Sequence, residues 1–179
     1  MSPADSPQVG IVLGSDSDFD AMGGALEVLR RFGVPHEMTV ASAHRSPARA
    51  AAYAQAAAGR GLRVLIAAAS GAAHLAGTLA AHTTLPVIGV PLATAPLSGF
   101  DALLATVQMP PGVPVATVAV GSWGAHNAAL LAVQILALGE PALARALSEY
   151  KQELARGVES KDAALQQRLA VAVQQSAAG

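Results

Sequence analysis

A histidine and an arginine stand side by side in the segment "SAHRSP", residues 42–47. Charged residues make up only 13% of the chain, so this corner stands out from its surroundings. His44 is the natural acid–base candidate, because an imidazole accepts and donates protons near neutral pH. Arg45 suits a phosphate group, since a guanidinium binds phosphate through two parallel hydrogen bonds. The pair therefore predicts proton transfer beside an anion site.

A second polar corner is "GSDSD", residues 14–18. It offers a glycine for close backbone approach, the hydroxyls of Ser15 and Ser17, and backbone N–H groups where a helix begins, which together suit a phosphate. It matches neither the dinucleotide fingerprint nor the lysine-bearing phosphate loop. The alternative is that Ser17 or Asp18 merely caps the helix. We favour an anion site, because Arg45 is expected at the end of the adjacent strand.

The remaining polar residues gather on three further corners: "ASGAAH" (69–74), "PLATAPLSG" (91–99) and "GSWGAHN" (121–127). His74 lies at the start of the third expected helix, where a packing or hydrogen-bonding role and a chemical role are equally open. His36 and His82 are interpreted as surface or packing residues. No metal site is expected, because the five histidines are not spaced with acidic residues as metal ligands are. The absence of cysteine excludes disulfides, thiol catalysis and thiolate metal ligation.

Apolar runs that alternate with helical patterns surround these corners. The predicted strands are 9–14, 35–42, 62–70, 85–91 and 113–121, and the predicted helices are 18–33, 47–59, 73–83, 100–108 and 125–139. Continuous apolar strands followed by helices predict an α/β fold, a three-layer, doubly wound parallel sheet of the flavodoxin-like kind. Ligands in such folds bind beyond the carboxyl ends of the strands, where the polar corners lie.

Composition limits the class of protein further. Hydrophobic residues make up 53% of the chain, yet no run is long enough to cross a membrane, so we expect apolar surface to be buried between subunits. The net charge is −1 without a basic block, which makes nucleic acid an unexpected partner. The polar first residues do not resemble a signal peptide, so a cytoplasmic protein is expected.

No repeat or linker divides the chain, so we expect a single domain over residues 1–179. Its core should span about 9–138. A C-terminal helical extension should cover about 141–175, either as one long helix or as two helices broken near Gly157. The apolar residues of this tail recur at helical spacing and share one face.

The corners, taken in order, resemble the 5-(carboxyamino)imidazole ribonucleotide mutase family, also called PurE. The segments that carry the resemblance are "GIVLGSDSD", "SAHRSP", "SGAAHLAG", "VIGVPLATAPLSGFDALLATVQMPPGVPVATVAVG" and "NAALLAVQIL", within residues 9–138. The resemblance implies an isomerase of de novo purine biosynthesis, active without metal or organic cofactor. It also implies a homo-octamer with active sites at subunit interfaces and C-terminal helices that reach onto neighbours.

The resemblance further implies a reaction and the residues that perform it. Carboxylate leaves the exocyclic nitrogen of the ribonucleotide as carbon dioxide and is recaptured at a carbon of the imidazole ring. His44 would transfer the protons. Phosphate and ribose contacts fall on Ser15, Asp18 and Arg45, with Ser17 and Ser42 assisting. The third corner would surround the carbon dioxide with Gly71, Ala72, Ala73, His74 and Leu75.

The chain departs from the usual family pattern at Ser70, Ala76, Pro96, Ser122, Trp123 and His126, which are expected near the substrate pocket. One rival interpretation is the carboxylase branch, which uses free carbon dioxide and tends to carry lysine after the histidine. Arg45 and "GAAH" favour the mutase. A non-catalytic nucleotide-binding module is a rival from another class. A nicotinate nucleotide carboxylase domain is a third rival, and it usually belongs to a longer chain.

Overall fold

The computed structural model describes residues 6–94 and 96–177. The chain divides into two compact units, residues 1–139 and 140–179. The expectation that the whole chain forms one domain stays a prediction.

The first unit is built on a parallel sheet of five strands in the order β2-β1-β3-β4-β5. The strands are β1 (Val9–Leu13), β2 (His36–Val40), β3 (Val64–Ser70), β4 (Val87–Leu92) and β5 (Ala116–Thr117). This is the flavodoxin-like strand order, in which the chain reverses direction across the sheet between β1 and β3. The predicted doubly wound α/β fold is confirmed.

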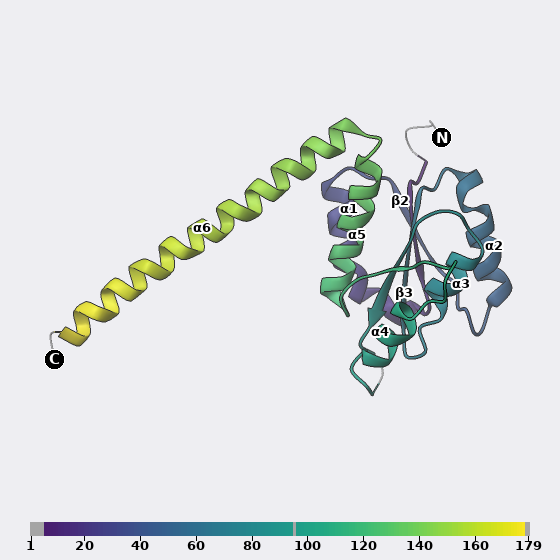
Figure 1. Ribbon diagram of the computed structural model, residues 1–179, viewed down its shortest axis with the longest axis horizontal. Coiled ribbons are helices and arrows are strands. Elements are labelled where there is room, and N and C mark those ends of the chain that lie inside the picture. The colour runs from purple at the N-terminus through teal and green to yellow at the C-terminus, as the bar shows by residue number, and fades with distance from the viewer. Residues whose placement is uncertain (1–5, 95, 178–179) are drawn as a thin grey trace. The chain divides into compact units, whose positions relative to one another are not determined.

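Helices cover both faces of this sheet (Figure 1). Helices α1 (Gly23–Arg31) and α5 (Ser122–Ala137) pack together on one face. The other face carries α2 (Pro47–Ala57), α3 (Leu75–Ala81) and α4 (Phe100–Val107). Small side chains bring the helices close to the strands, since α2 buries Ala50, Ala54 and Ala57 at helical spacing. The core therefore depends on alanine and aliphatic side chains.

Two elements differ most clearly from their predicted bounds. The helix expected over 18–33 begins only at Gly23, after short 3-10 turns at Asp16–Asp18 and Asp20–Met22. Aspartate side chains there accept hydrogen bonds from nearby backbone N–H groups, which competes with helix formation. Strand β5 is much shorter than 113–121, and Pro114, which lacks an N–H donor for a sheet ladder, lies two residues before its start.

The second unit is the single helix α6 (Pro141–Ala177), which continues through Gly157 without a break. The tail is therefore one long helix and not two. Its exposed large apolar side chains include Leu154, Val158, Leu165 and Leu169. Within the part of the chain that the structure describes, no helix is long and apolar enough to cross a membrane.

Candidate active site

A cavity of about 130 Å³ lies beyond the carboxyl ends of β1, β2 and β3, at the reversal point of the sheet. Small-molecule sites typically measure roughly 300–1,000 Å³, so a ligand of nucleotide size would extend beyond the walls that one chain supplies. The lining residues come from three corners: Gly14, Ser15 and Asp18 after β1; Ser42, Ala43, His44 and Arg45 after β2; Ala69, Ser70, Ala73, His74 and Leu75 at the end of β3 and beyond. Residues far apart in sequence therefore meet beyond the carboxyl ends of the strands, where the fold class places ligands.

The corner after β1 holds a carboxylate in an unusual state. Asp18 is only 2% exposed, and its Oδ2 accepts a hydrogen bond from the Ser15 N–H at 3.2 Å. Its Oδ1 is buried and has no hydrogen-bond partner among the described residues. Burial raises the pKa of the Asp18 carboxyl above its usual range, although the Ser15 hydrogen bond and the charge of Arg45 oppose this shift. Ser17 donates its hydroxyl to the Ser15 Oγ at 2.9 Å.

The corner after β2 is closed by two serines. The Ser42 N–H donates to the Ser46 Oγ at 3.0 Å, and the Ser46 N–H donates to the Ser42 carbonyl at 2.9 Å. The Arg45 N–H donates to the Ser42 Oγ at 3.1 Å, so the turn is fixed by local bonds. Pro47 then begins α2, a position that needs no N–H donor.

The Arg45 guanidinium extends across the carboxyl end of β1. Its single hydrogen bond among the described residues is a long one, 3.4 Å, to the Gly14 carbonyl. Most of the donors on this side chain are therefore available to a ligand. Arg45 gives the cavity most of the donors that a phosphate group requires. The Ser15 hydroxyl donates to the Asp16 Oδ1 at 3.2 Å, so it must turn away from Asp16 to add a further donor.

His44 meets His74 across the cavity, although 30 residues separate them. The His44 Nε2 and the His74 Nδ1 are 2.7 Å apart, and the rings meet edge to face with centroids 4.8 Å apart. Only one proton fits between the two nitrogens, so one ring donates and the other accepts. The sequence left the role of His74 open, and no spacing signal could reveal this contact.

The third corner divides the predicted residues into two groups. Ala73 and Leu75 are buried in the cavity wall, and Ala73 adopts a positive φ of 31°, which is strained for alanine. Gly71 and Ala72 do not line the cavity. Ser17 is likewise absent from the lining, although it contacts Ser15.

Some lining residues were missed, and most of the departures from the family pattern lie elsewhere. Ala43 and Ala69 line the cavity without any side-chain feature that could have singled them out. Ser70 also lines it, as expected near a pocket. Ala76 does not line the cavity; it follows Leu75 in α3 and packs in the core. The other departures do not line this cavity; they are Pro96, Ser122, Trp123 and His126.

The described residues hold no group of three or more His, Asp or Glu side chains that could bind a metal ion. The cavity groups that can act on a ligand are Arg45, the Ser15 hydroxyl, the unpaired Asp18 oxygen and the two imidazoles. They can bind a phosphorylated, hydroxyl-bearing molecule and move a proton on it.

Comparisons with known proteins add an independent observation. The family described as AIR carboxylase matches residues 8–157. The N5-carboxyaminoimidazole ribonucleotide mutase of Synechocystis is 54% identical over 161 residues, covering 90% of each chain. The phosphoribosylaminoimidazole carboxylase of Schizosaccharomyces pombe is 52% identical over 152 residues, covering 85% of this chain and 27% of that protein. A solved structure of Treponema denticola PurE has a TM-score of 0.79 and 25% sequence identity, covering 88% of this chain and 97% of that one.

Proposed function

The chain belongs to the AIR carboxylase family, and we propose that it is a mutase of de novo purine biosynthesis. The reaction converts 5-(carboxyamino)imidazole ribonucleotide to 5-amino-4-carboxyimidazole ribonucleotide. One observation carries the proposal: the cavity joins His44 and Arg45 to the Ser15–Asp18 corner at the sheet reversal. Identity of 54% to a protein named as this mutase supports the choice of substrate.

Binding of the ribonucleotide begins with its charged end. Arg45 and the Ser15 hydroxyl donate hydrogen bonds to the phosphate, and Ser17 and Ser42 assist from the same two corners. The unpaired Oδ1 of Asp18 accepts a hydrogen bond from a ribose hydroxyl, because a carboxylate repels phosphate and attracts O–H donors. This contact satisfies the buried oxygen that the chain alone leaves unpaired.

His44 performs the proton transfers of both half-reactions. Protonated His44 donates to the exocyclic nitrogen as its bond to the carboxylate breaks, which leaves an amino group and carbon dioxide. A bond then forms between the ring carbon and carbon dioxide, and neutral His44 takes the proton released from that carbon. The proton count returns to its starting value, as an isomerisation requires. His74, 2.7 Å from His44, lies within reach to share the proton.

The third corner confines the carbon dioxide between the two steps. Ala73 and Leu75 supply a small, buried apolar wall, and Gly71, Ala72 and His74 complete the corner. Confinement makes recapture effectively unimolecular, with effective molarities of about 10⁵ M or more in well-oriented cases. Free carbon dioxide in a cell is far more dilute, so a trapped molecule reacts before it escapes.

The rival function is a carboxylase that uses free carbon dioxide and aminoimidazole ribonucleotide. Overall similarity does not separate the two, because a relative named as a carboxylase is 52% identical. Arg45 after the histidine and the "GAAH" segment favour the mutase. The discriminating assay supplies carboxyl-labelled substrate in a large excess of unlabelled bicarbonate. A mutase transfers the label to the ring product with little dilution, and dilution to the level of the pool would favour the carboxylase.

The proposal includes a homo-octamer in the cytoplasm. Exposed apolar side chains support an assembly: Leu97, Phe100, Leu104 and Val107 lie on or beside α4, and Trp123 is 81% exposed in the single chain. Burial of these surfaces against other copies would account for the apolar composition. Light scattering should give eight times the chain mass of 17.9 kDa, and a stable monomer would contradict the assembly.

A further inference from the structure

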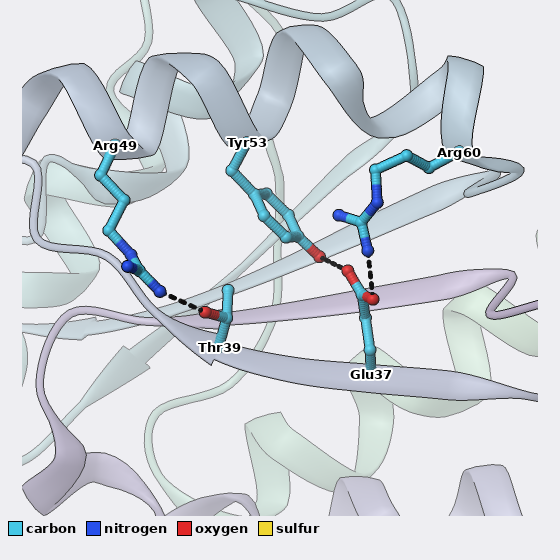
Figure 2. Close-up of polar contacts among 5 residues, drawn as sticks. All are labelled: Glu37, Thr39, Arg49, Tyr53 and Arg60. Atoms are coloured by element: carbon cyan, nitrogen blue, oxygen red, sulfur yellow. Dashed lines mark hydrogen bonds and ion pairs between the residues drawn. The ribbon is translucent and has the colours of Figure 1, made fainter.

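Helix α2 presents a row of polar side chains to the edge strand β2 (Figure 2). Tyr53 donates its hydroxyl to the Glu37 Oε1 at 2.7 Å, and Arg60, just beyond the helix, forms an ion pair with the Glu37 Oε2. Arg49 makes a separate contact at the other end of the row, with Thr39. We call these five residues, Glu37, Thr39, Arg49, Tyr53 and Arg60, the flank network.

Arg49 differs from the other members because it links the two ends of the corner after β2, which we call the catalytic corner. Its Nε–H donates to the carbonyl of Val40, the last residue of β2, at 2.9 Å. One of its terminal nitrogens donates to the Thr39 Oγ1 at 3.1 Å. Arg49 itself is the third residue of α2, so the chain between its two anchoring points is the segment that carries His44 and Arg45.

The position of β2 in the sheet explains why such a bond matters. β2 is the edge strand, so it has a neighbour only on the β1 side. On that side the Ala41 N–H donates to the Leu13 carbonyl at 2.9 Å and continues the ladder. Adjacent residues of a strand point their backbone groups in opposite directions, so the Val40 carbonyl faces the open edge. Arg49 supplies the partner there that a further strand would otherwise provide.

We propose that Arg49 is a positioning residue, which fixes the corner from Ala41 to Ser46 so that His44 and Arg45 reach the substrate. This inference rests on the proposed function. Ser42 and Ser46 fix the shape of the turn, and Arg49 fixes the turn to the strand before it. Proton transfer depends on heavy-atom distances within hydrogen-bond reach, and displacement of a reacting group by about 1 Å costs roughly 100-fold in rate.

Arg60 offers a matched control for Arg49. Both are exposed arginines that join the α2 segment to β2, and each binds an acceptor on that strand. Arg60 follows the carboxyl end of α2 and binds Glu37, near the amino end of β2 and away from the catalytic corner. Loss of Arg60 should therefore weaken the attachment of α2 without displacing His44.

The experiment compares Arg49→Met with Arg60→Met by kcat, KM and melting temperature on the carboxyamino substrate. Each substitution keeps an unbranched stem and removes the guanidinium. We expect Arg49→Met to lower kcat by about 10- to 100-fold, with a smaller effect on KM, and Arg60→Met to leave kcat within about twofold. Arg49→Lys, which keeps one donor group, should recover part of the loss. Equal kcat for the two methionine variants would overturn the inference.

A second measurement separates this inference from the proposed function. NMR signals of the His44 and His74 rings, assigned with His44→Asn, report their 2.7 Å contact without any substrate. Arg49→Met should shift or broaden these signals, whereas Arg60→Met should leave them in place. A wild-type protein without mutase activity but with this NMR difference would refute the function and retain the positioning role. Unchanged ring signals in Arg49→Met would refute the positioning role.

Discussion

The first unit contains two polar clusters of opposite character, the candidate site and the flank network. In the flank network both carboxylate oxygens of Glu37 have partners, Tyr53 and Arg60, and Arg49 binds two acceptors. In the site, one buried oxygen of Asp18 has no partner among the described residues, and the Arg45 guanidinium makes a single long bond among them. Buried polar groups are normally paired, so unpaired ones in a cavity point to a ligand. The bonded groups of the flank network hold the fold, whereas the Asp18 oxygen and the Arg45 guanidinium keep bonding capacity for a ligand.

Among the variants that test this comparison, His44→Asn should cause the largest loss of activity. Loss of general acid–base catalysis costs about 10²–10⁴-fold in kcat, and one group serves both half-reactions here. Assembly and melting temperature should stay close to those of the wild type, because His44 is exposed in the cavity wall. His82→Asn, at an exposed histidine outside the cavity, is the control and should keep full activity. Retained activity in His44→Asn would assign the chemistry elsewhere, with His74 the next candidate.

Arg45→Ala tests whether the incompletely bonded guanidinium serves the ligand. A charge-assisted contact to phosphate is worth about 1.5–3 kcal/mol, so substrate affinity should fall by roughly 10- to 150-fold. Arg45→Lys should recover only part of it, because the fork geometry is lost. Calorimetric titration measures the affinity, and a melting curve measures the stability. A melting-temperature loss as large as that of Arg60→Met would instead place Arg45 among the structural groups.

Gly10→Ala tests the flank network through stability alone. A Cβ at Gly10 in β1 would lie 2.3 Å from the Tyr53 Oη, so the tyrosine must move away from Glu37. We expect a loss of about 1–3 kcal/mol in the free energy of unfolding, with substrate affinity unchanged. The loss should be smaller in a Tyr53→Phe background, where the clashing oxygen is absent. If the losses from Gly10→Ala and Tyr53→Phe simply add, the contact with the tyrosine oxygen is not what excludes a side chain at position 10.

Asp18→Asn should have the smallest effect on stability, and with the opposite sign. Below the usual pKa of an aspartate, Asp18 is neutral in both the folded and the unfolded chain. As the pH rises through its raised folded-state pKa, the buried carboxyl must ionise and the wild type loses stability. The variant should therefore melt higher than the wild type at neutral pH, and this difference should shrink in acid. A difference independent of pH would contradict the burial of an ionised carboxyl.

The same variant should bind substrate more weakly. A neutral amide oxygen accepts a weaker hydrogen bond from a ribose hydroxyl than a carboxylate does, so we expect a loss of roughly fivefold in affinity. Calorimetry with the substrate measures this loss. Greater stability together with weaker binding is the pattern expected of a group kept for its ligand. Unchanged affinity would remove Asp18 from the binding residues.

The sequence alone predicts the fold because strand and corner signals are local. Apolar runs mark β1, β3 and β4, and Pro47 marks the start of α2. The Ser15, Asp18, His44 and Arg45 corners follow strand ends, so parallel strand order brings them together. Sequence patterns were less informative where side chains compete with the backbone for hydrogen bonds, as in the aspartate-rich turns before α1.

Contacts between distant residues could not be predicted in this way. The His44–His74 pair depends on how two corners face each other across the cavity. The Glu37–Tyr53 bond depends on register, because Gly10 lies opposite Glu37 and leaves room for the tyrosine. The roles of Arg49, Tyr53 and Arg60 were not predicted, because they depend on β2 being an edge strand.

The most direct test of this account is a crystal structure of His44→Asn with the carboxyamino substrate bound. The substitution stops turnover and leaves the cavity otherwise intact. The account predicts that the substrate phosphate contacts Arg45 and Ser15 and that a ribose hydroxyl contacts the unpaired oxygen of Asp18. The imidazole ring of the substrate should lie beside the substituted side chain at position 44. A substrate bound outside this cavity, or one whose phosphate does not contact Arg45, would contradict the assignment of the unpaired groups to the ligand.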